Sequence, residues 1–149
     1  MKTEKKAAEK KAVEKAPGQR RSRRSSGSRR LSGEVAKTVR AALDKKAVDV
    51  VVLDLRNTSA FTDFFVLCSG LNQRQVKAIV DAIEDTLRAA RIRPAHIEGY
   101  DRADWVLMDF FNFIVHVFTP QTREFYSLER LWGDAERIEI SDTATGNGA

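Results

Sequence analysis

Five carboxylates in the middle of the chain are the side chains best suited to hold a metal ion. They are Asp63, Glu98, Asp101, Asp104 and Asp109. Two-metal phosphoryl transfer requires such groups to converge within a few ångströms, commonly from alternate positions of one strand. No segment that reads as a strand offers two acidic residues at positions i and i+2. The sequence therefore predicts neither a metal site nor a bound cofactor.

The two histidines and the single cysteine could in principle serve zinc binding or nucleophilic catalysis. His96 and His116 fall on different expected strands, and Cys68 alone does not supply the further ligands that zinc requires at close spacing. Cys68 also has no base near it in sequence. A buried strand thiol is the favoured interpretation, and we expect no catalytic residue.

Residues 69–72 (SGLN) join a strand to a helix N-terminus, where free amides could hold a phosphate. The loop lacks a glycine-rich fingerprint and a phosphate-binding lysine. The pattern favours a tight turn in which Asn72 caps the helix.

Residues 104–119 (DWVLMDFFNFIVHVFT) read as two strands joined by a tight turn near Phe111-Asn112, because β-branched and aromatic residues crowd both sides of an asparagine. This register gives one apolar face made of three cross-strand pairs. The pairs are Phe110 with Phe113, Met108 with Val115 and Val106 with Val117. We predict that this face lies in the core.

The other face of the same hairpin mixes large apolar side chains with a carboxylate and an imidazole. It carries Trp105, Leu107, Asp109, Ile114, His116 and Phe118. Such a face is too apolar for open solvent and too polar for a dry core. We expect it to be an exposed docking surface in preference to ordinary burial. The expected partner-binding residues are Trp105, Leu107, Asp109, His116 and Phe118, with Glu98 at the rim. The same patch is apolar enough to pair with a second copy as a homodimer.

Hydrophobic periodicity predicts the elements that position this hairpin. They are a helix from Ser32, strands over 49–55 and 62–69, a helix from Asn72 to just before Pro94, a strand over 95–100, and a helix from Thr119-Pro120. We expect an α/β (α+β) domain over residues 32–135, with a single mixed sheet of about five strands and helices mainly on one face. Residues 136–149 read as a disordered C-terminal tail.

The charge of the chain is concentrated at its N-terminus. Residues 1–30 hold twelve Lys and Arg against three Glu, whereas residues 31–149 hold fourteen basic and eighteen acidic residues. We predict that residues 1–31 form a disordered basic tail, because they cannot bury enough apolar surface to fold. Six of its arginines are candidates for phosphate contacts with nucleic acid: Arg20, Arg21, Arg23, Arg24, Arg29 and Arg30. A solubilising extension is the alternative.

A single cysteine excludes an intramolecular disulfide and suits a reducing compartment. No run approaches the roughly 20 apolar residues of a membrane span, and no apolar N-terminal segment suggests secretion. We therefore expect a cytoplasmic protein without a membrane partner.

Short motifs along most of the chain carry a family resemblance. They are LDL, FTDFFVLCSG, RQVKAIVDAI, EGY, ADWVLMDF, IVHVFTP and REFYSLERLW. Together they resemble the Iojap-like ribosomal silencing factors over roughly residues 35–132. The specific matches are Thr62-Asp63, Glu98-Gly99, Asp104-Trp105, residues 115–118 (VHVF) and residues 126–132 (YSLERLW). Two positions depart from the family pattern: Phe111-Asn112 stands where Gly-Asp is usual, and residues 57–60 (NTSA) replace Gly-x-Ser-Ser.

The resemblance implies a nucleotidyltransferase-like fold without transferase activity. It further implies a protein that binds the large ribosomal subunit on its L-fourteen protein. Members of the family prevent the small subunit from joining, which represses translation under nutrient limitation. Two other function classes stay open from the residues alone: a nucleotidyltransferase-type enzyme acting on a nucleotide or RNA, and a nucleic-acid binder that works through its basic tail.

Overall fold

The protein is seen in a computed structural model that describes residues 32–140. The predicted basic tail over residues 1–31, with its six arginines, and the end of the C-terminal tail over residues 141–149 lie outside the described residues. The described elements, in chain order, are α2 (Gly33–Asp44), β1 (Val48–Asp54), β2 (Phe64–Ser69), α3 (Gln73–Ala89), β3 (His96–Glu98), β4 (Trp105–Asp109), β5 (Phe113–Phe118), α4 (Pro120–Tyr126), α5 (Leu128–Leu131) and β6 (Glu136–Glu139).

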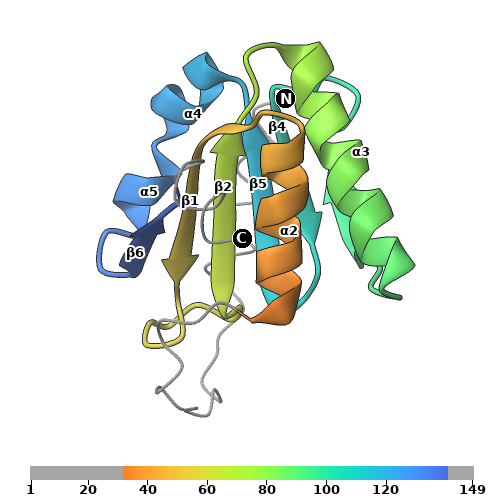
Figure 1. The fold of residues 1–149 in the computed structure, drawn as a ribbon. Coiled ribbons are helices and arrows are strands. Elements are labelled where there is room, and N and C mark those ends of the chain that lie inside the picture. Colours follow the sequence, from red (N-terminus) through yellow and green to blue (C-terminus); the bar gives the residue numbers. More distant parts are fainter. Residues whose placement is uncertain (1–31, 141–149) are drawn as a thin grey trace.

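The strands form one mixed sheet in the order β3-β4-β5-β2-β1-β6 (Figure 1). β2 and β5 run parallel, and every other neighbouring pair is antiparallel. The predicted single mixed sheet is confirmed, with six strands in place of about five. None of the helices within residues 32–140 combines the length and apolarity that crossing a membrane requires.

The helices α2 and α3 cover one face of the sheet (Figure 1). Each begins at a polar cap: the Ser32 hydroxyl accepts the Val35 amide proton at 3.2 Å, and the Asn72 side chain accepts that of Gln75 at 2.9 Å. The apolar stripe of α3 recurs at helical spacing and is buried: Val76, Ile79, Val80, Ile83 and Leu87. The predicted core face of the hairpin packs in the same cluster.

The hairpin has the predicted register. Val106 pairs with Val117 and Met108 with Val115. The Phe110 amide donates to the Phe113 carbonyl at 3.0 Å, which closes the turn. Phe111 occupies the left-handed region in this turn, with φ of 74°, a conformation that glycine adopts more easily.

Gly99 fixes how the chain enters the hairpin. Its φ is +84°, and a Cβ at this position would lie 2.3 Å from the Trp105 carbonyl oxygen. Any other residue would therefore push β3 away from the start of β4.

The opposite face of the sheet is covered as well, by the short helices α4 and α5. Leu128 is buried there, and Tyr126 and Trp132 pack beside it against strand residues that include Leu53 and Phe65. The longer helices do lie on one face, but the expectation that the second face is left open is wrong. The helix predicted from Thr119-Pro120 does begin there, but it is short: Ser127 adopts φ of 42° and separates α4 from α5.

Residues 136–139 form β6, which pairs antiparallel with β1. The Ile140 amide continues the ladder with a 3.0 Å bond to the Val50 carbonyl. The prediction of a disordered tail from residue 136 is therefore wrong for these residues. The segment carries three charged residues, yet Ile138 and Ile140 pack against the core, and alternation is enough to anchor a strand at the sheet edge.

Candidate partner-binding face

Six ring-bearing side chains meet between the sheet and α4–α5, and we refer to them as the aromatic cluster. They are Phe65, Trp105, His116, Phe118, Tyr126 and Trp132. The Trp105 ring lies 5.1 Å from that of Phe118 and 4.9 Å from that of Tyr126. The predicted hairpin register sets Trp105 opposite Phe118, and the structure has this pair. Tyr126 of α4 packs on Trp105.

His116 is a hydrogen-bond acceptor within this cluster. The Trp105 Nε1–H donates to His116 Nδ1 at 3.0 Å, so the neutral ring carries its proton on Nε2. Full burial lowers the pKa of His116 from 6.5 to about 3, because the charged imidazolium is disfavoured away from water. His116 is therefore neutral at physiological pH, and its role here is to orient Trp105.

Five of the six expected partner-binding residues are buried by the chain itself. Trp105 is only 2% exposed, and Leu107, Asp109, His116 and Phe118 are buried with it. The expectation that their side chains face solvent is wrong. For Trp105, Leu107, His116 and Phe118 the cause is the layer of α4 and α5, whose mixed polar and apolar sequence does not reveal which side faces the sheet. Their role in partner binding stays a prediction. Because these side chains are buried, they can act on a partner only indirectly, by supporting the residues above them.

The two predicted acidic rim residues take different places. Asp109 accepts the Phe111 amide proton at 2.8 Å and so stabilises the hairpin turn. Glu98 is half-buried on the edge strand β3, where its carboxylate lies 2.6 Å from His96 Nε2. Only Glu98 has the partly exposed position that a rim contact requires.

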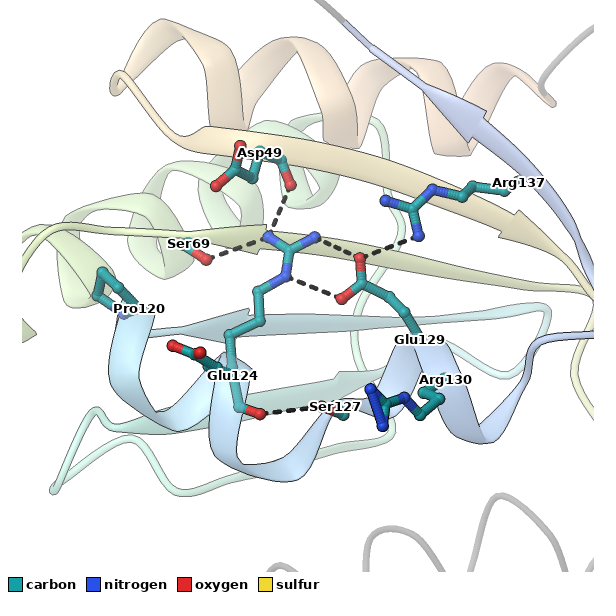
Figure 2. Close-up of a pocket in the computed structure, with 9 residues that line it drawn as sticks. Asp49, Ser69, Pro120, Glu124, Ser127, Glu129, Arg130 and Arg137 are labelled. Atoms are coloured by element: carbon teal, nitrogen blue, oxygen red, sulfur yellow. Dashed lines mark hydrogen bonds and ion pairs between the residues drawn. The ribbon is translucent and has the colours of Figure 1, made fainter.

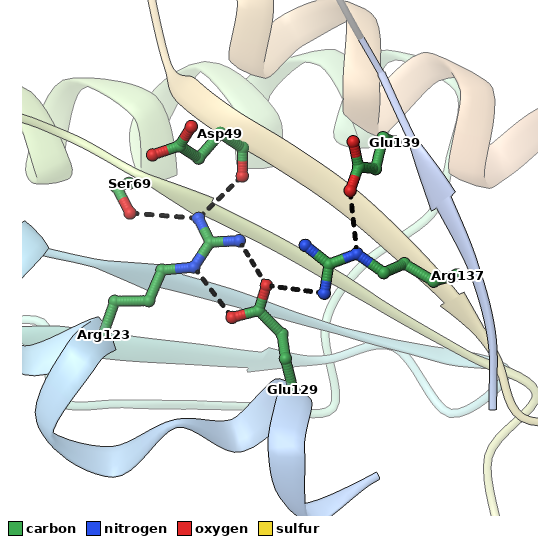
Figure 3. A network of polar contacts seen from close by, with 6 residues as sticks. All are labelled: Asp49, Ser69, Arg123, Glu129, Arg137 and Glu139. Carbon is green, nitrogen blue, oxygen red and sulfur yellow. Dashed lines mark hydrogen bonds and ion pairs between the residues drawn. The ribbon is translucent and has the colours of Figure 1, made fainter. Parts of the chain in front are cut away.

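A buried arginine, which no pattern in the sequence singles out, ties the second face together (Figure 3). Arg123 of α4 donates to the Asp49 carbonyl at 2.6 Å and to the Ser69 hydroxyl at 3.1 Å. It also holds Glu129 of α5 through two bonds, of 3.2 and 2.9 Å. Four of the five guanidinium protons are thus used within the fold.

Glu129 extends this network to the edge of the sheet. Its carboxylate lies 3.4 Å from Arg137 of β6, which also donates to Glu139 at 3.0 Å. Partial burial alone would raise the pKa of Glu129, but the hydrogen bonds and charges of Arg123 and Arg137 outweigh burial and hold the pKa below its usual range. The carboxylate therefore stays ionised, and its ion pairs with Arg123 and Arg137 connect α5 to α4 and to β6.

A polar pocket of about 570 Å³ opens beside Arg123 (Figure 2). It is lined by Asp49, Ser69, Pro120, Arg123, Glu124, Ser127, Glu129, Arg130 and Arg137. Arg123, Glu129 and Arg137 form ion pairs within the network. The charged side chains of the pocket that form no ion pair with another described residue are Asp49, Glu124 and Arg130.

The remaining sequence candidates do not assemble a reactive centre. Within residues 32–140 no three His, Cys, Asp or Glu side chains come close enough to hold a metal ion. Burial raises the pKa of Cys68 to about 12, so this thiol is not a nucleophile near neutral pH. Asn72 caps α3 as expected, and the Ser69 hydroxyl accepts a hydrogen bond from Arg123.

Exposed apolar side chains remain on the outer side of the layer that covers the aromatic cluster. Phe125 of α4 is 76% exposed and Leu131 of α5 is 55% exposed. Among residues 32–140, two other large apolar residues are comparably exposed, Leu71 and Phe111. The protein is thus an α+β domain with exposed apolar side chains on two short helices, and ion pairs hold these helices on the sheet.

Comparison with known proteins identifies the family. Residues 28–148 match the model of the family described as "Ribosomal silencing factor during starvation", and the chain belongs to this family. A ribosomal silencing factor of Halalkalibacterium halodurans is 41% identical over 102 residues, which cover 68% of this chain and 87% of that protein. A mouse protein named "Mitochondrial assembly of ribosomal large subunit protein 1" is 34% identical over 59% of this chain and 40% of its own length.

A solved structure shows the same fold. A crystal structure of a Bacillus halodurans protein superposes with a TM-score of 0.63 and 37% identity, covering 71% of this chain and 96% of that one. The resemblance inferred from the motifs is thereby confirmed.

Proposed function

We propose that this protein binds the large ribosomal subunit through its L-fourteen protein and prevents the small subunit from joining. Translation would then fall under nutrient limitation. Family membership over residues 28–148 is the observation that carries the proposal. The mouse relative, named for assembly of the large ribosomal subunit, supports the choice of subunit.

The chemistry of the described residues supports a binding role without catalysis. Arg123 is committed to structural bonds, His116 is buried and neutral, and the Cys68 thiol is held protonated. We propose that no nucleotide is transferred. A ligand present at 100 times its dissociation constant would stabilise the fold by ~2.7 kcal/mol. Thermal unfolding with Mg²⁺ and each nucleoside triphosphate checks this, and a stabilisation of that size would favour the enzyme alternative.

The buried members of the predicted site have a supporting role in this proposal. Trp105, Leu107, His116 and Phe118 form the floor on which α4 and α5 rest, and Asp109 shapes the hairpin turn. Glu98, on the edge strand, stays the proposed rim contact. Acidic rim groups suit a basic ribosomal protein and would speed encounter more than they hold the complex.

We further propose that the N-terminal arginines contact ribosomal RNA phosphates, in the cytoplasm where the subunits assemble. For each phosphate contact that is lost, the slope of log affinity against log salt concentration should become shallower by about 0.7 to 0.9. Replacing Arg20, Arg21, Arg23, Arg24, Arg29 and Arg30 by glutamine should therefore flatten the salt dependence of subunit binding. An unchanged slope would leave the tail as a solubilising extension.

Sedimentation with purified ribosomal subunits tests the function. The protein should travel with the large subunit and not with the small one. Large subunits incubated with it should then fail to form joined ribosomes when small subunits are added. Binding to neither subunit, or normal joining in the presence of bound protein, would contradict the proposal.

A further inference from the structure

The two short helices of the second face carry apolar groups on both of their sides. On the inner side, Leu128 is 1% exposed and Tyr126 packs on Trp105. On the outer side, Phe125 and Leu131 are largely exposed. The inner groups account for the packing of the layer on the sheet, so the outer groups are in excess of what the fold needs. We call Glu124, Phe125, Arg130 and Leu131 the outer α4–α5 surface.

This surface is held firmly although the helices beneath it are short. α4 has seven residues and α5 has four, and helices of that length do not persist alone in water. Arg123 and Glu129 join the two helices to each other, to β1 through the Asp49 carbonyl, and to β6 through Arg137 (Figure 3). A surface that is ordered before binding loses less entropy when a partner docks.

The charge around this surface indicates the kind of partner. Arg123 and Arg137 are neutralised by Glu129 and Glu139. The remaining charged residues of this segment are exposed and form no ion pair with another described residue: Glu124, Arg130, Asp134 and Glu136. Three of these four are acidic, and one of the three, Glu124, adjoins Phe125 in α4. A segment of net negative charge favours a basic partner.

We propose that the outer α4–α5 surface docks a basic segment of a partner protein. Apolar side chains of that segment cover Phe125 and Leu131, and a Lys or Arg of the segment faces Glu124, which lines the polar pocket (Figure 2). This inference rests on the proposed function, since it names the surface that meets the large subunit. A second copy fits less well, because two-fold pairing sets the same acidic surroundings against themselves.

Matched alanine variants test the apolar half of the surface. Phe125→Ala and Leu131→Ala should each weaken binding to purified large ribosomal subunits about tenfold or more, the scale of interface hot spots. Phe111→Ala and Leu71→Ala remove equally exposed side chains outside the surface, 68% and 65% exposed. These controls should bind within about twofold of the wild type. All four residues are exposed, so the fold should persist, and circular dichroism checks that it does.

Charge reversal tests the other half. Glu124→Lys should slow association several-fold at low salt, whereas Asp101→Lys, which reverses an exposed charge in the loop before β4, should not.

The outcomes separate this inference from the proposed function. If the wild type binds large subunits and Phe125→Ala and Leu131→Ala bind equally well, the inference is wrong and the proposed function stands. If the wild type binds no subunit, the proposed function fails and the inference fails with it. If Phe125→Ala instead converts a wild-type dimer to a monomer while subunit affinity is unchanged, a second copy occupies the surface and the inference is overturned.

Discussion

The two faces of the sheet are stabilised in different ways. The α2–α3 face buries aliphatic side chains from two long helices, with Cys68 and Thr38 as its few polar atoms. The α4–α5 face buries rings, an imidazole and a guanidinium beneath helices of seven and four residues. The first face is bound by hydrophobic burial, which is insensitive to orientation. The second depends on directional hydrogen bonds and charge pairs, which fix where its outer side chains point.

This difference indicates a division of labour. Apolar burial on the first face supplies most of the stability and leaves nothing large and apolar exposed on α3. On the second face, buried polar groups hold α4 and α5 in place, and the outer side of these helices carries the exposed apolar side chains of Phe125 and Leu131. Substitutions of buried residues on the first face should therefore affect folding alone, whereas those of the buried residues that hold α4 and α5 should affect folding and recognition together.

The largest effect should come from the α2–α3 face. Ile83→Ala removes a fully buried side chain of α3 and should lower the free energy of unfolding by ~3 kcal/mol through the cavity it leaves. Chemical denaturation measures this. Large-subunit affinity of the folded variant should stay as in the wild type. A selective loss of affinity would show that the two faces are not separate in function.

Arg123→Met should destabilise the second face by about 2 kcal/mol, because it leaves Glu129 with one partner and two acceptors without their donor. Unlike Ile83→Ala, it should also weaken subunit binding in the folded protein, since α4 and α5 lose their brace. Arg123→Lys keeps the charge but not the planar fork, so it should restore only part of either property. Wild-type stability in Arg123→Met would mean that the network contributes nothing to the fold.

His116 should give the second face an acid sensitivity that the first face lacks. Its pKa is about 3 in the fold against 6.5 for the free group, so the unfolded chain binds more protons between these values. Stability should therefore fall as pH drops from about 6.5 toward about 3, by up to ~1.4 kcal/mol per pH unit. His116→Gln keeps an acceptor for Trp105 but does not titrate, so its unfolding free energy should fall less steeply between pH 6.5 and 4.5. If the unfolding free energies of the wild type and His116→Gln fell equally steeply with pH, His116 would have to be exposed to solvent, contrary to this structure.

The smallest effect should come from the hairpin turn. Phe111→Gly should raise the free energy of unfolding by ~0.5 kcal/mol, because relief of the left-handed conformation slightly exceeds the added entropy of the unfolded chain. Asn112→Gly is the matched control, since Asn112 has no positive φ, and it should be neutral or slightly destabilising. A loss of stability in Phe111→Gly would show that its ring makes contacts worth more than the strain.

The sequence predicted what depends on local pattern. Alternation specified the pairing of Val106 with Val117 and of Trp105 with Phe118, and apolar spacing specified the buried stripe of α3. Motifs identified the family. What it did not reveal depends on long-range contacts: Arg123 meets the Asp49 carbonyl across 74 positions of the chain. For the same reason the sequence did not reveal the burial of Trp105, which depends on α4 and α5. It did not reveal β6 either: the residues of β6 do alternate, but three of its four residues are charged, which is atypical of a strand.

Amide hydrogen exchange of the protein, free and bound to large ribosomal subunits, tests the division between the two faces most directly. On binding, we expect added protection in α4 (Pro120–Tyr126) and α5 (Leu128–Leu131), with α3 (Gln73–Ala89) unchanged. Protection confined to α2 and α3, with α4 and α5 exchanging as in the free protein, would contradict this division.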